Sequence, residues 1–185
     1  MNRLLTGSLA AIGATLVSVA APAELPQGAA APTFVTQGAL AGKEFTFDLS
    51  RALRKGPVVL YFYPKSFTSG CTIEAHAFAE ASKQFRAAGA TLIGLSADTI
   101  ATQKDFSRKD CRDQFPVGVA TLAIMTGYDV HLKQPDGTAT GLSSRTSYVI
   151  GRDGKVKLVF TDMNPNDHVK MTLQAVRTLR TARHR

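Results

Sequence analysis

The chain has 185 residues, a formal net charge of +8 and two cysteines, Cys71 and Cys111. This length suits one globular domain with its own core, and a hydrophobic share of 44% argues against intrinsic disorder. Two cysteines exclude a disulfide-rich scaffold and a four-cysteine zinc site. They leave two inert core thiols, one structural disulfide or a redox pair.

Residues 1–23 have the pattern of a secretory signal peptide. Arg3 is their only charged residue, the run from Leu4 to Ala21 is apolar and small, and Ala21-Pro22-Ala23 is an A-x-A cleavage pattern. We expect cleavage near Ala23 and a periplasmic or secreted protein. An uncleaved membrane anchor is the alternative, although the run is short for a span and is diluted by glycine, serine and threonine.

The mature chain opens with a segment rich in alanine, glycine and proline, residues 24–32, which we expect to be a flexible lead-in to one domain over 33–185. Residues 58–63 predict a buried strand that stops at Pro64, and residues 91–96 predict a second. Between them, a helix is indicated by apolar residues four apart: Ile73, Ala77, Ala81 and Phe85. Strand, helix and strand form a βαβ unit with a parallel pair.

Further elements follow in chain order. Asp98 is expected to cap a helix that runs through Phe106 towards Cys111, and a short helix is expected around residues 122–128. Strands over 147–150 and 155–160 flank an Asp-Gly turn, which indicates a hairpin. Asp167 is expected to cap a last helix with an apolar stripe of Val169, Leu173, Val176 and Leu179. This order predicts an α/β thioredoxin-like fold, a central mixed sheet with helices on both faces.

Basic residues gather at the C-terminus, where residues 170–185 contain no acid. No aromatic residues are interleaved with these charges, and cations near a helix C-terminus are favoured by the helix dipole. We therefore interpret them as a solvated helix face and expect no nucleic-acid partner.

Cys71 stands where a buried strand gives way to a helix, behind Thr68 and Gly70. Catalytic groups of open α/β sheets collect at that edge. Unpaired N–H groups and the dipole at a helix start favour a thiolate over a thiol. The alternative is a small buried core residue, but Cys71 precedes the apolar stripe instead of lying on it.

The segment around Cys71 resembles the peroxiredoxin (AhpC/TSA) superfamily. Pro64-x-x-x-Thr68-x-x-Cys71 matches the family's P-x-x-x-T-x-x-C motif, and residues 61–74 look most like the bacterioferritin-comigratory, or Q-type, branch. Residues 145–150, followed by Asp153-Gly154, resemble a second signature, an arginine that opens the strand before a D-G turn. The similarity runs from about Ala31 to the last helix.

This resemblance implies a thiol-dependent peroxidase for hydrogen peroxide and organic hydroperoxides. Cys71 would attack the terminal peroxide oxygen and become a sulfenic acid. Arg145 would favour the thiolate and orient the peroxide, although a solvated arginine before a strand is the alternative. Thr68 would hydrogen-bond the sulfur and the peroxide, the Cys71 N–H would hold the substrate oxygen, and Pro64 would exclude water. Glu74 is either a support for an arginine or an exposed helix residue.

Many Q-type members carry a second cysteine five residues after the first, but His76 occupies that position here. Another subset places the resolving cysteine on the helix after the second strand, and Cys111 lies at the end of that element. We interpret Cys111 as the resolving cysteine, with a free thiol in a one-cysteine enzyme as the alternative. If the two Cα atoms lie beyond about 7 Å, a bridge requires local unwinding of both segments.

The expected partners are a hydroperoxide and a thioredoxin-like or other dithiol reductant, and the Q-type resemblance suggests a monomer. No metal or cofactor is expected, because the histidines show no ligand spacing and no glycine-rich phosphate loop follows a strand. Two other functions compete: a thiol–disulfide oxidoreductase, which normally has C-x-x-C where Thr68 stands here, and a non-catalytic binding or chaperone-like protein.

Overall fold

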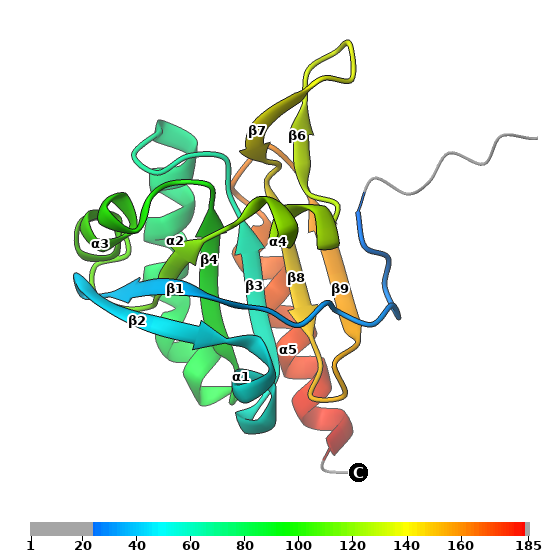
Figure 1. Cartoon of the computed structure of the whole chain (residues 1–185). Helices are drawn as coiled ribbons and strands as arrows, with labels where there is room; N and C mark the ends of the chain where they lie inside the picture. The colour runs from blue at the N-terminus through cyan, green and yellow to red at the C-terminus, as the bar shows by residue number, and fades with distance from the viewer. Residues whose placement is uncertain (1–23, 184–185) are drawn as a thin grey trace, which may run out of the picture.

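A seven-stranded mixed sheet organises the computed structural model, which describes residues 24–183; the expected signal peptide lies outside these residues. The strand order is β2-β1-β5-β4-β3-β8-β9 (Figure 1). A separate pair, β6 and β7, projects beyond one end of the sheet. The strands are β1 (Val35–Leu40), β2 (Lys43–Asp48), β3 (Val58–Phe62), β4 (Thr91–Ser96), β5 (Val117–Val119), β6 (His131–Lys133), β7 (Ala139–Ser143), β8 (Thr146–Ile150) and β9 (Val156–Thr161).

The centre of the sheet confirms the predicted βαβ unit. β3 and β4 are parallel, and β3 is antiparallel to β8 in a register that pairs Phe62 with Thr146. β8 and β9 form the predicted hairpin, in which Gly154 adopts the positive φ that the turn requires. Because β8 begins where β3 ends, residues just before β8 lie beside the loop that follows β3.

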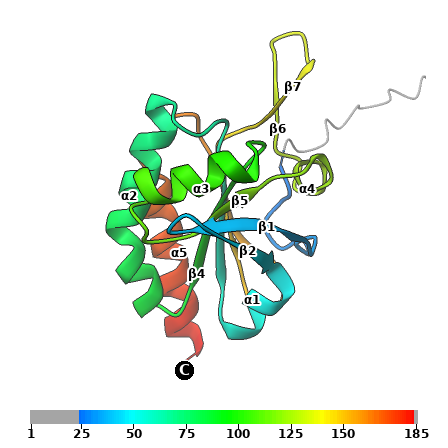
Figure 2. The same ribbon diagram turned by 60° about the vertical axis from the view of Figure 1, so that its left-hand side comes forward.

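Helices cover both faces of the sheet, as the sequence predicted (Figure 2). They are α1 (Leu49–Lys55), α2 (Ser69–Ala87), α3 (Ile100–Lys109), α4 (Leu122–Gly127) and α5 (His168–Arg183). Alternate residues of β3 point to opposite faces, so Leu60 packs in a core with α1 and α4, whereas Tyr61 packs in a second core with α2 and α5. Both cysteines belong to this second core.

The buried face of α2 differs from the one predicted. Ala81 and Phe85 are buried as predicted, but Ile73 is 54% exposed and Ala77 is half-buried. The core side also includes Cys71, Glu74, Ala75, Phe78, Ala79 and Ser82. A spacing of four drifts around a helix of 3.6 residues per turn, so a run of such steps does not stay on one face. The actual stripe mixes steps of three and four and includes a carboxylate, which the hydrophobic pattern does not indicate.

The helix starts were predicted with mixed success. Thr99, not Asp98, caps α3, and its hydroxyl accepts the N–H of Thr102. The carboxylate of Asp98 instead accepts hydrogen bonds from the Ser66 N–H and the Ser96 hydroxyl, each at 2.7 Å.

On α5 the predicted apolar stripe is confirmed, because its four residues all pack in the second core.

Residues 24–32, expected as a flexible lead-in, are hydrogen-bonded to the rest of the domain. The N–H of Gly28 donates to the Val156 carbonyl and that of Ala31 to the Gly154 carbonyl, each at 2.8 Å. The segment therefore lies along the β8–β9 hairpin, and the boundary at residue 33 stays a prediction. Within residues 24–183, no helix combines the length and the hydropathy needed to span a bilayer.

Candidate active site

Cys71 lies in the first turn of α2, at the end of the sheet where β3 stops. Thr68 is the N-cap of this helix with an extended backbone, and Phe67 before it has a φ of +63°. This sharp turn brings the chain from the buried strand into the helix within a few residues. Cys71 is 2% exposed and forms no disulfide, so the thiol is available for chemistry but shielded from bulk water.

Arg145 faces Cys71 from the position just before β8, the strand that neighbours β3. Its Nη2 donates to the Cys71 sulfur at 3.5 Å, its Nη1 donates to Glu74, and its Nε donates to the Met163 carbonyl at 3.0 Å. Burial disfavours the cation, but Glu74 and Cys71 together raise the pKa of Arg145 above its ordinary value. The alternative of a solvated arginine is wrong, and the guanidinium is held in three directions by fixed partners.

Gly70 makes room for this arrangement. A Cβ at this position would lie 3.1 Å from Nη2 of Arg145. The glycine next to Cys71 therefore allows the guanidinium to reach the sulfur.

Glu74 is fully buried on α2 and contacts Arg145, so the alternative of an exposed helix residue is wrong. Burial raises the pKa of the Glu74 carboxyl to about 8, and Arg145 opposes this rise without cancelling it. Burial therefore favours the protonated form of the carboxyl, and the nearby guanidinium favours the ionised form. Its contacts are with Arg145 and His168, which places it behind the guanidinium as a support.

Thr68 and Pro64 lie on the outer side of the loop. The Thr68 hydroxyl donates to the Lys65 carbonyl at 2.9 Å, so its one proton is directed away from the Cys71 sulfur in this state. It must rotate to take the role that the resemblance implies. Pro64 is half-buried directly after Tyr63, in a position consistent with shielding the site.

Buried polar groups hold the loop between β3 and α2 in place. Its Ser66 N–H is tied to Asp98 at the end of β4. The Tyr63 hydroxyl donates to Gln103 of α3 at 2.7 Å, and the Tyr63 carbonyl accepts the Ser143 hydroxyl at 2.8 Å. These bonds anchor the loop to three neighbouring elements, which fixes the position of the cysteine that follows.

Cys111 is also a buried free thiol, just beyond the end of α3. Burial, together with the charges of Asp110 and Asp113, raises the pKa of this thiol well above its ordinary value. The next two residues, Arg112 and Asp113, have φ values of +50° and +58°, a left-handed conformation that strains residues other than glycine. In this state Cys111 is a protonated thiol in a strained segment.

The sequence interpretation missed His168 and Ser147. Both are fully buried, and they hydrogen-bond each other at 2.8 Å beside Glu74. His168 had been considered only as a metal ligand. A sequence signal was the spacing, because His168 and Thr172 stand eight and four residues before Val176 of the predicted apolar stripe. In the structure all three are fully buried on α5.

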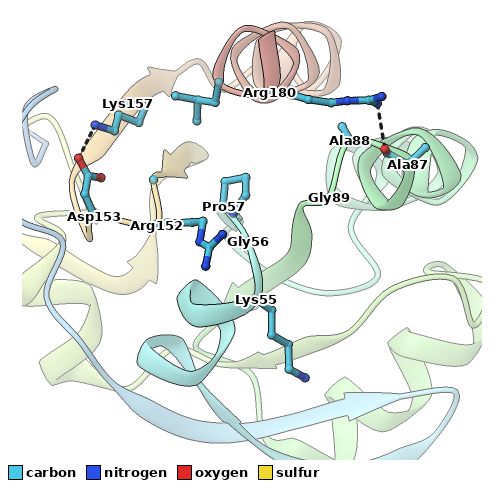
Figure 3. A pocket seen from close by; sticks show the side chains of 12 residues that line it. Lys55, Gly56, Pro57, Ala87, Ala88, Gly89, Arg152, Asp153, Lys157 and Arg180 are labelled. Carbon is cyan, nitrogen blue, oxygen red and sulfur yellow. Dashed lines mark hydrogen bonds and ion pairs between the residues drawn. The ribbon is translucent and has the colours of Figure 1, made fainter. Parts of the chain in front are cut away.

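A hollow of about 440 Å³ lies at the opposite end of the sheet, away from Cys71 (Figure 3). It is lined by the start of β3, the end of α2, the β8–β9 turn and α5, and several of its cations already have partners. Lys157 bonds Asp153, and Arg180 donates to the Ala87 carbonyl. We assign it no part in the chemistry. In the described part of the chain, no three His, Cys, Asp or Glu side chains gather as a metal site would require.

The sheet order and the two helix layers are those of a thioredoxin-like peroxiredoxin fold. The chain belongs to the AhpC/TSA family, whose profile matches residues 27–159.

Among curated proteins, the chain is 36% identical over 126 residues to "Peroxiredoxin Q, chloroplastic" of Suaeda salsa. That match covers 66% of this chain and 56% of the relative, so the chain spans little more than half the relative's length.

Two solved structures agree with this assignment. "Peroxidoxin BcpB" of Mycobacterium tuberculosis is 28% identical with a TM-score of 0.72, over 83% of this chain and 97% of that one. Peroxiredoxin Q of Xanthomonas campestris is 26% identical with a TM-score of 0.68, over 78% and 90%.

Proposed function

We propose that this protein is a thiol-dependent peroxidase that reduces hydrogen peroxide and organic hydroperoxides through Cys71. One observation carries the proposal: a permanently charged guanidinium nitrogen lies 3.5 Å from the sulfur of a cysteine in the first turn of a helix. A cation and a helix N-terminus both favour the thiolate, which is the nucleophilic form. Membership of the AhpC/TSA family supports the same chemistry.

In the proposed reaction, the Cys71 thiolate attacks the terminal oxygen of the hydroperoxide. The O–O bond breaks, the sulfur gains the hydroxyl as a sulfenic acid, and the leaving alkoxide or hydroxide takes up one proton. Arg145 stabilises the negative charge before and during this transfer. A small opening of the loop admits the substrate, because the sulfur is buried in the closed state.

We assign the resolving step to Cys111. Its thiolate would attack the sulfenic sulfur, water would leave, and an external dithiol would reduce the disulfide. The raised pKa of the buried thiol disfavours this attack in the closed state. The step therefore requires local opening of the segment after α3, and the positive φ values of Arg112 and Asp113 lower the cost of that opening.

The experiment is consumption of hydrogen peroxide with dithiothreitol as reductant, comparing the wild type with Cys71→Ser and, as the matched control, Cys111→Ser. We expect Cys71→Ser to abolish turnover and Cys111→Ser to keep rapid oxidation of Cys71, after which dithiothreitol reduces the sulfenic acid directly. Wild-type turnover in Cys71→Ser would refute the proposal. Insulin disulfide reduction without peroxide consumption would indicate a thiol–disulfide oxidoreductase instead.

Disulfide mapping by mass spectrometry after stoichiometric peroxide tests the resolving role. A Cys71–Cys111 bridge is expected, within one chain or between two. Its absence would assign resolution to an external thiol.

We also propose that the protein is exported with cleavage near Ala23. Its reductant would then be a thioredoxin-like protein outside the cytoplasm, and the protein would be a monomer. N-terminal sequencing of the secreted protein and sedimentation would test the first and the last.

A further inference from the structure

Behind Arg145, on the side away from Cys71, lies a group of polar side chains drawn from three elements. Glu74 comes from α2, Ser147 from β8 and His168 from the first turn of α5, and none of the three has exposed surface. The charged groups around His168 are Glu74, Arg145 and the nearby Asp162 and Asp167. The chemistry proposed above does not use this group.

The hydrogen bonds fix the tautomer of His168. Its Nε2 lies 2.9 Å from the carbonyl of Asp162, which can only accept, so Nε2 carries the hydrogen. In the neutral ring Nδ1 is then an acceptor, and the Ser147 hydroxyl donates to it at 2.8 Å. The ring is also held edge-to-face against Phe160, with centroids 4.8 Å apart.

The second oxygen of Glu74 faces this acceptor. Oε2 accepts from Arg145, but Oε1 is buried and has no hydrogen-bond partner among the described residues. The nearest polar atom of His168, Nδ1, lies 3.7 Å from Oε1. An ionised oxygen left without a donor in this place is costly, whereas a protonated Oε1 can donate to Nδ1 once the Ser147 hydroxyl turns its hydrogen away, because a neutral ring nitrogen offers one lone pair.

We propose that Glu74 and His168 hold one proton between them, and that His168 is a positioning residue which, through this proton, sets the charge behind the guanidinium of Arg145. The inference rests on the proposed peroxidase function. The directions of the two titrations agree with it, because burial raises the pKa of Glu74 and lowers that of His168, so the proton resides on the carboxyl.

The charge on Glu74 decides how much of the arginine's charge Cys71 receives. When Glu74 is neutral, the full positive charge of Arg145 stabilises the thiolate and the reacting peroxide. An ionised Glu74 neutralises part of that charge and adds a negative one behind it. The rate of Cys71 oxidation therefore falls as Glu74 ionises.

The test is the rate constant for oxidation of Cys71 by hydrogen peroxide from pH 5 to 10, by quenched flow and mass spectrometry, in the Cys111→Ser background. We expect a fall on the alkaline side. His168→Phe keeps the packed ring but removes the acceptor. The pH at which the rate constant decreases should therefore be lower by about one unit, the effect of one hydrogen bond. Ser147→Ala removes the competing donor to Nδ1, so the pH at which the rate constant decreases should be higher. His131→Asn, at a histidine that bonds Thr126, should leave the profile unchanged.

Opposite shifts in the two variants support the inference, because a merely structural role would not produce them. An alkaline fall that neither variant moves, that both move in the same direction, or that His131→Asn moves equally would overturn it. Should His168→Phe not fold, the upward shift in Ser147→Ala decides alone. A Cys71 that peroxide fails to oxidise at any pH would refute the proposed function itself, which is a separate result.

Discussion

Replacing Arg145 by glutamine removes the charge from the guanidinium position while keeping a polar side chain there. Its Nη2 lies 3.5 Å from the Cys71 sulfur, and both groups are buried. At an effective dielectric constant of about 20, two unit charges at this distance attract by roughly 4–5 kcal/mol. Because each 1.36 kcal/mol corresponds to a factor of ten, the rate of Cys71 oxidation should fall about 10³-fold.

The assay is the second-order rate constant of Cys71 with hydrogen peroxide, measured together with the free energy of unfolding in urea. Arg145→Gln also removes the hydrogen-bond donor to the buried Glu74 carboxyl, so some loss of stability is expected as well. The double variant Glu74→Gln/Arg145→Gln removes that buried carboxyl and should recover stability without recovering the rate. Arg145→Lys keeps the charge but cannot donate to Cys71, Glu74 and the Met163 carbonyl at the same time, so we expect an intermediate rate.

A rate in Arg145→Gln within tenfold of the wild type would refute the electrostatic account. So would a double variant that recovers both stability and rate, because the arginine would then act only through the fold.

Three further predictions follow from the same contacts. Because the pKa of Glu74 is raised from about 4.5 to about 8, the folded state binds the extra proton, so its stability should decrease from pH 5 to 8, and urea unfolding should show a smaller decrease in Glu74→Gln. His76→Ala breaks the 3.3 Å contact with Asp110, so the disulfide with Cys111 should form severalfold faster by quenched mass spectrometry, while an unchanged rate would exclude this contact as a restraint. The buried Tyr61 hydroxyl has no partner among the described residues, so Tyr61→Phe should raise the unfolding free energy by about 1 kcal/mol, and a loss of stability would contradict this.

The sequence predicted the centre of the sheet and the site because strong local signals coincide there. The strand over 91–96 matches the structure, and the strand before Pro64 ends within a residue of its predicted limit. Both are runs of buried apolar residues, and turn residues bound them. Thr68 and Gly70 indicate a helix start at Cys71, and the structure places Cys71 in the first turn of α2.

The edge of the sheet was not predicted, for a physical reason. β1 is half-exposed and mixes polar residues with short apolar ones, so neither a run nor a clean alternation marks it. β2 has only one short alternation, Phe45-Thr46-Phe47, which is too brief to identify a strand by itself. The polar group behind Arg145 was missed because its members come from α2, β8 and α5. Only the tertiary fold brings Glu74 to His168, and no spacing along the chain records that contact.

Trapping of sulfenic acid tests the central claim most directly. Cys111→Ser is treated with one equivalent of hydrogen peroxide, labelled with dimedone and digested for mass spectrometry, alongside Cys71→Ser. The account predicts stoichiometric dimedone adduct on Cys71 within seconds and unlabelled Cys111 in the companion variant, because only Cys71 has a cation at its sulfur. A Cys71 that remains a free thiol, or equal labelling of the two cysteines, would contradict it.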